Sequence, residues 1–114
     1  MTTGPKYRIQ ESSSDSSRIV TVSGEIDLAS APKLETALVA EADQTVIVDL
    51  LEVGFMDSTG LRSLLSARDA LEEGGGRLLL VFGEGPVERI LELTGLTDRF
   101  EHVPSLEAAT QAAG

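Results

Sequence analysis

The chain has 114 residues, no cysteine and a formal net charge of −10, from 19 acidic and 9 basic residues. This length suits one domain with its own core, and the lack of cysteine excludes disulfides and thiolate metal sites. The negative charge argues against direct binding to nucleic acid or to an anionic membrane, and no apolar run approaches the roughly 20 residues of a membrane span.

The first part of the chain predicts two strands. Residues 7–10 are a short first strand, and the Ser/Asp-rich residues 11–17 predict a solvated loop. Residues 18–24 are β-branched and partly alternating, which predicts a second strand with a bulge or bend at Gly24.

A helix and the most apolar strand follow. Ser30 is a candidate N-cap with Pro32 in the first turn, and an apolar stripe predicts a helix to about Ala42. Residues 45–50 form the next strand, and their continuous apolar run predicts burial on both faces of a sheet.

The middle of the chain predicts a long helix and a further buried strand. The helix follows the polar turn at residues 57–60, runs to about Glu73 and stops at the three glycines 74–76. Residues 77–82 are again continuously apolar after Arg77 and predict a strand.

The last part predicts a helix that opens at Pro86 and ends at Gly95. Residues 100–103 are a short last strand, and Ser105 caps a final helix.

Helices that alternate with apolar strands predict an α/β fold: a single domain whose mixed, mostly parallel sheet has four to five strands and about four helices. The first two strands are joined too closely for a crossover helix, which predicts an antiparallel edge. The domain is expected over residues 1–114, with its core at about 7–112. Residues 1–6 lack the apolar core of a signal peptide, so we expect a cytoplasmic protein.

The turn at residues 57–60, Asp-Ser-Thr-Gly, presents a hydroxyl where a strand leads into a helix. Free N–H groups at a helix N-terminus favour a negatively charged group such as a phosphate. Nothing nearby would make Ser58 a nucleophile, because the single histidine, His102, is distant in sequence. A serine presented without catalytic machinery indicates a residue that is modified, although a plain helix cap is the simpler interpretation of these four residues alone.

Other patterns offer little chemistry. Gly83-Glu84-Gly85 lacks the remaining residues of a phosphate-binding loop, so it predicts an ordinary turn. His102 lacks companion ligands for a metal ion. Asp49 and Glu52 are expected to be solvated or capping carboxylates rather than an acid–base pair.

Five motifs occur in order along nearly the whole chain: Gly24-Glu25-Ile26-Asp27, Ala31-Pro32-Lys33-Leu34, Val48-Asp49-Leu50, Val53 through Leu61, and Leu93-Thr94-Gly95-Leu96. Together they resemble the STAS family, the fold of bacterial anti-sigma factor antagonists. Several motifs in this order are far more specific than the turn at residues 57–60 alone.

The resemblance implies that an anti-sigma factor, itself a serine kinase, phosphorylates Ser58, with Thr59 the weaker candidate. The unmodified chain would bind and sequester this kinase and so free a sigma factor, and a phosphatase would reverse the modification. The resemblance also places Asp27 near the phosphorylation site. It implies no catalytic residue, metal or cofactor in this chain. The expected partner-binding residues are Glu25, Asp27, Asp57, Ser58, Thr59, Gly60 and, as the first exposed helix positions, Arg62 and Ser63.

Three alternatives remain open. The chain could be a STAS scaffold or sensor subunit of a larger signalling or transporter assembly, or a STAS subunit of a lipid transporter or of an anion-transporter-type regulator. It could also be a small enzyme that uses Ser58, which the missing base and orienting group disfavour.

Overall fold

The computed structural model describes residues 6–41 and 43–113. The expectations for residues 1–5 and for Ala42 lie outside the described residues. One sheet contains five strands: β1 Tyr7–Ser14, β2 Ser17–Ile26, β3 Thr45–Met56, β4 Arg77–Val81 and β5 Glu101–Val103. The helices of the described residues are α1 Ala31–Leu38, α2 Ser58–Glu73, α3 Pro86–Thr94, the 3₁₀ helix η1 Thr97–Arg99 and, after the last strand, α4 Leu106–Ala113.

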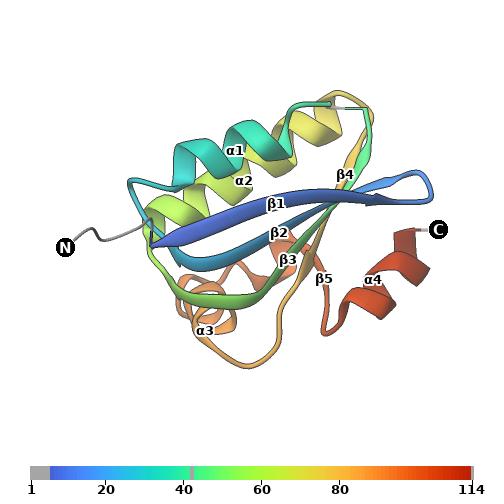
Figure 1. Ribbon diagram of the computed structural model, residues 1–114. Coiled ribbons are helices and arrows are strands. Elements are labelled where there is room, and N and C mark those ends of the chain that lie inside the picture. Colours follow the sequence, from blue (N-terminus) through green and yellow to red (C-terminus); the bar gives the residue numbers. More distant parts are fainter. Residues whose placement is uncertain (1–5, 42, 114) are drawn as a thin grey trace.

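The strands lie in chain order, β1-β2-β3-β4-β5. β1 is antiparallel to β2, whereas β2, β3, β4 and β5 run parallel. Figure 1 shows the twisted sheet with α1 and α2 on one face and α4 on the other. The predicted α/β class, with a mostly parallel sheet and an antiparallel edge, is confirmed.

Two cores explain the apolar runs. Val46 and Val48 belong to the main core, which α1, α2 and α3 share, whereas Ile47 between them faces α4 on the other side of the sheet. Leu79 of β4 also packs against α4, while its neighbours Leu78 and Leu80 join the main core. Successive strand side chains point to opposite faces, so a strand covered on both sides needs an unbroken apolar run. The predicted burial of these strands is confirmed.

The loop predicted over residues 11–17 is wrong. β1 continues to Ser14 and β2 begins at Ser17, leaving a tight turn in which Asp15 has a φ of 53°. The serines of this hairpin extend the ladder through their backbones, pairing Ser12 with Ile19 and Ser14 with Ser17. Because β1 is a largely exposed edge strand, it forms without an apolar pattern.

The helix ends agree with the sequence at some positions and differ at others. α1 ends at Leu38, several residues earlier than predicted, and the Ser30 hydroxyl does not cap it. Gly95 adopts the left-handed conformation that closes α3, and the Leu96 N–H donates to the Leu91 carbonyl at 2.9 Å. Ser105 caps α4 as predicted, accepting a hydrogen bond from the Ala108 N–H at 3.1 Å.

An ion pair fastens the short strand β5 to β4. The Arg77 Nε donates to both carboxylate oxygens of Glu101, each at 3.0 Å. The hydrogen bond from Arg77 is the main reason why the pKa of Glu101 lies below its ordinary value, while partial burial opposes the shift. A depressed carboxyl pKa stabilises the fold above the unfolded-state pKa, and that stability is lost as pH falls through the folded-state pKa.

We therefore expect Glu101→Gln to lower the free energy of unfolding at neutral pH by at most about 1 kcal/mol, because the pair is half-exposed. The difference from wild type should narrow as the pH falls through the depressed pKa of Glu101, because the wild-type carboxyl then also becomes neutral. Urea unfolding at pH 7 and at low pH measures this, with Glu41→Gln, an exposed residue after α1, as the control. A difference that stays constant with pH would contradict the role of this pair.

Candidate functional site

Two turns meet at the carboxyl edge of the sheet. β2 ends at Ile26 and β3 at Met56, and these residues pair in parallel register. The Asp57 N–H then donates to the Ile26 carbonyl at 3.2 Å, which joins the start of one turn to the end of the other strand. The turn after β2 and the turn after β3 therefore lie side by side, as ligand sites of parallel sheets commonly do.

Asp57 caps α2 and leaves Ser58 free. Its Oδ1 accepts hydrogen bonds from the N–H groups of Thr59 at 2.9 Å and Gly60 at 3.1 Å. Ser58 is the first residue of the helix and is exposed, as predicted. The cap is thus Asp57, and the Ser58 hydroxyl lies on the surface of a rigid helix N-terminus.

Gly60 is buried at the point where α2 crosses the two strand ends. A Cβ at this position would lie 2.6 Å from Cγ2 of Ile26 and 2.9 Å from Cγ of Met56. Because Gly60 has no side chain, the first turn of α2 can pack directly against the ends of β2 and β3.

Asp27 organises the neighbouring turn in the same way. Its Oδ1 accepts from the N–H groups of Ala29 at 3.0 Å and Ser30 at 3.3 Å. The buried Ser30 hydroxyl donates to the Glu25 carbonyl at 2.8 Å and accepts from the Asp27 N–H at 3.0 Å. Ser30 therefore closes this turn instead of capping α1, because its hydroxyl is turned back toward β2.

The remaining predicted residues divide by burial. Glu25 and Thr59 are partly buried and Arg62 is exposed, so all three border the surface. The predicted exposure of Ser63 is wrong, because only 8% of this residue is exposed. Ser63 lies on the stripe of α2 that packs on the sheet, three residues after Gly60 and four before Ala67.

Sequence reasoning missed an apolar surface beside this site. Phe55, Met56, Pro86, Arg89, Ile90 and Leu93 line a hollow of about 240 Å³. Phe55 is 46% exposed and Leu93 80% exposed, and Leu28 in the turn after β2 is also largely exposed. β4 pairs with β3 only as far as Asp49, so the end of β3 has no neighbouring strand on that side. Nothing in the apolar pattern of residues 51–56 reveals this.

The site contains no paired catalytic group. His102 lies on β5, two strands away from β3, and stacks on Phe82 with ring centroids 5.0 Å apart. Among the described residues, no cluster of three or more histidine, cysteine or acidic side chains could hold a metal ion. The arrangement offers an exposed hydroxyl, ordered carboxylates and an apolar hollow, which suit binding.

No helix in the described parts of the chain combines the length and apolar character needed to cross a membrane.

Comparison with known proteins places this arrangement in a family. The STAS domain profile matches residues 7–109. The chain is 38% identical over 85 residues to the anti-sigma-B factor antagonist of Listeria monocytogenes, covering 72% of this chain and 75% of that protein.

Solved structures agree. An anti-sigma factor antagonist from Mycobacterium paratuberculosis superposes with a TM-score of 0.85 at 32% identity, covering 98% of both chains. The Bacillus cell fate determinant SpoIIAA in its phosphorylated form shares the fold with a TM-score of 0.70 at 19% identity, covering 92% of this chain and 99% of that one. From the match of its sequence and of its fold, this chain belongs to the STAS domain family.

Proposed function

We propose that this protein is an anti-sigma factor antagonist whose binding is switched at Ser58. Unphosphorylated, it binds an anti-sigma factor that is also a serine kinase, and it thereby frees a sigma factor in the cytoplasm. Phosphorylation of Ser58 releases the partner, and a phosphatase resets the switch. In this proposal the chain is a substrate and a binding module rather than an enzyme, and ATP belongs to the kinase.

The observation that carries the proposal is the exposed Ser58 in the turn ordered by Asp57, next to the turn ordered by Asp27. The described residues show no base paired with Ser58. The relatives at 38% and 32% identity that are named as antagonists support it. The docking face comprises Glu25, Asp27, the turn at residues 57–60 and Arg62, and the exposed Leu28 and Phe55 add apolar area.

Charge explains how the switch releases its partner. A phosphoserine adds roughly −1.5 to −2 charges. The Asp57 carboxylate already accepts from the N–H groups of Thr59 and Gly60, so these donors are not free to neutralise the new charge. A partner that tolerates the neutral hydroxyl would have to desolvate a dianion beside Asp57, which is very unfavourable. The fold should survive, because the phosphate projects from a helix N-terminus.

The direct test is incubation of the protein with its anti-sigma partner and ATP, followed by mass spectrometry of the modified peptide. A single phosphate on Ser58 is expected, and Ser58→Ala should abolish it. A stable complex without any phosphate transfer would instead favour a STAS scaffold or sensor subunit.

The acidic turn after β2 should attract a basic partner surface. Asp27→Asn keeps the Oδ1 that accepts from Ala29 and Ser30 but removes the charge. We expect about three- to tenfold weaker binding to the anti-sigma factor, mostly through slower association. Added salt should diminish the difference between the two proteins.

The control for this prediction is Asp98→Asn, which changes the net charge equally. Asp98 is exposed on η1, before β5 and so at the opposite edge of the parallel strands. Equal association rates for the two variants, measured by surface plasmon resonance, would show that only the total charge matters.

A further inference from the structure

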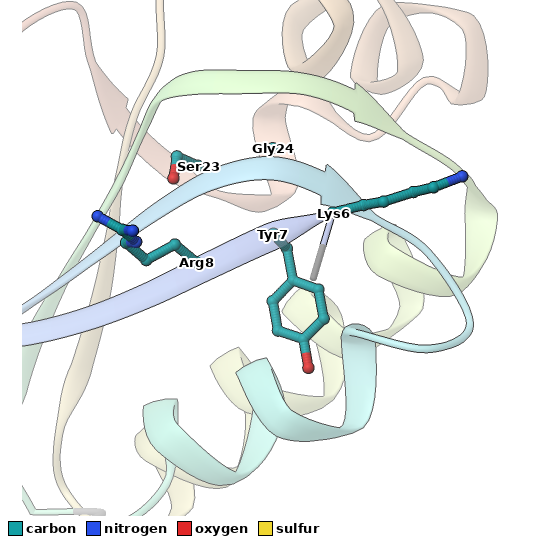
Figure 2. A pocket seen from close by; sticks show the side chains of 5 residues that line it. All are labelled: Lys6, Tyr7, Arg8, Ser23 and Gly24. Carbon is teal, nitrogen blue, oxygen red and sulfur yellow. The ribbon is translucent and has the colours of Figure 1, made fainter. Parts of the chain in front are cut away.

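A hollow with cationic walls lies at the start of β1. It has a volume of about 370 Å³ and is lined by Lys6, Tyr7, Arg8, Ser23 and Gly24. Figure 2 shows the Tyr7 ring pointing toward α1, whereas the Arg8 side chain and the Ser23 hydroxyl lie on the other side of the strands. The Lys6 side chain extends away from Arg8 in Figure 2, so Arg8 and Ser23 lie together on one part of the hollow and Lys6 lies at its end.

Neither cation is paired within the protein, which is also true of the exposed Lys33, Arg62, Arg89 and Arg99 among the described residues. The guanidinium groups of Arg18, Arg68 and Arg77 each contact a carboxylate. Lys6 and Arg8 are exposed, and no carboxylate of the described residues lies within ion-pair distance of either. In a chain with 19 acidic residues, two such cations on one hollow are available for an acidic group from outside.

Backbone geometry holds the hollow in shape. The antiparallel register places Arg8 opposite Ser23 and Tyr7 opposite Gly24. At Gly24 the strands approach so closely that a Cβ would lie 2.2 Å from the Lys6 carbonyl oxygen. The Lys33 ammonium lies 5.9 Å from the centroid of the Tyr7 ring and braces that side chain against α1.

The hollow adjoins the proposed docking face. The Glu25 N–H donates to the Lys6 carbonyl at 2.8 Å, and Asp27 follows two residues later. The Lys6 end of the hollow therefore lies beside the start of the turn that carries Asp27.

We infer that this hollow receives a carboxylate side chain, Asp or Glu, of the anti-sigma partner, an inference that rests on the function proposed above. The partner must then carry charges of both signs. Its cations face the acidic turns after β2 and β3, and its carboxylate enters the hollow. Paired charges of both signs fix the orientation of a complex and disfavour partners with a uniformly basic surface.

The test compares Arg8→Glu with Arg99→Glu by calorimetry against the anti-sigma factor without ATP. Both substitutions lower the net charge equally, and Arg99 is exposed on η1 at the opposite edge of the sheet. Arg8→Glu should weaken binding about tenfold or more, with Arg99→Glu within about twofold of wild type and Arg8→Lys intermediate. Urea unfolding of each variant checks that the fold is retained.

Three results would overturn the inference. The first is equal affinity of the Arg8→Glu and Arg99→Glu variants. The second is saturation of the free protein by inorganic phosphate below about 1 mM, followed by the amide resonances of Ser23 and Gly24, which would assign the hollow to a small anion. The third is a dimer in sedimentation that Arg8→Glu dissociates, which would assign it to a second copy of this chain.

The same measurements separate this inference from the function on which it depends. If wild type binds and Ser58→Asp weakens binding, but Arg8→Glu behaves like Arg99→Glu, then only the inference about the hollow fails. If wild type does not bind the anti-sigma factor, the proposed function fails and the inference fails with it.

Discussion

Ser58→Asp is expected to weaken binding of the anti-sigma partner by about tenfold or more, and enzymatic phosphorylation should weaken it further because a phosphate carries more charge. Ser58→Ala should bind like wild type and resist ATP-dependent release. Because Asp57 provides the helix cap, Ser58→Ala should change the free energy of unfolding by no more than about 0.5 kcal/mol. Calorimetry with and without ATP measures the binding, and urea unfolding measures the stability.

Ser66→Asp is the matched control for this prediction. Ser66 is exposed on α2 two turns beyond Ser58, so it carries the same new charge on the same helix. It should bind within about twofold of wild type if the effect depends on position. Equal weakening by the two aspartates would remove Ser58 from the interface and leave only a general charge effect.

Gly24→Ala should lower the free energy of unfolding by about 2–4 kcal/mol, through backbone strain and overpacking. Gly24 has a φ of +89°, which side chains rarely adopt, and the new Cβ would lie 2.2 Å from the Lys6 carbonyl oxygen and 2.8 Å from the Tyr7 Cα. Both contacts are with backbone, so no side-chain rotation can relieve them. The β1–β2 pairing would have to separate locally.

Gly54→Ala is the control, since Gly54 also lies at a strand end but a Cβ there meets nothing within 4 Å. Urea unfolding midpoints and slopes measure both variants, and Gly54→Ala should stay within about 0.5 kcal/mol of wild type. Equal stability of the two variants would show that β1 can move away from Gly24 at little cost in free energy. The hollow inferred to bind a carboxylate would then lack a rigid wall.

Features with a strong local signal could be predicted from the sequence. The continuous apolar runs at residues 46–48 and 78–81 are buried strands, because a strand covered on both faces admits no polar alternation. The polar turn before α2 and the glycine after α3 also stand where predicted. Such signals depend on a few neighbouring residues and their backbone preferences, which the sequence displays directly.

Pairing between strands decided the extent of β1 and the exposure of the end of β3, which the local sequence does not predict. The serine-rich residues of β1 form a strand because β2 supplies a hydrogen-bonding partner, not because of their own preference. Phe55 is half-exposed because β4 ends earlier than β3, although its residue type favours the core. Neither result can be read from a single segment.

The sequence by itself determined the order of the elements, the buried apolar strands β3 and β4 inside the sheet and a serine presented at a helix N-terminus. Only the tertiary structure decided which residues share a surface. The register of β2 on β3 brought the turn after Ile26 beside the turn after Met56, the packing of α2 buried Gly60 and Ser63, and the β1–β2 pairing placed Arg8 across from Ser23. The physical reason is that strand order, register and helix contact depend on residues distant in the chain, whereas turns, caps and apolar runs depend on near neighbours.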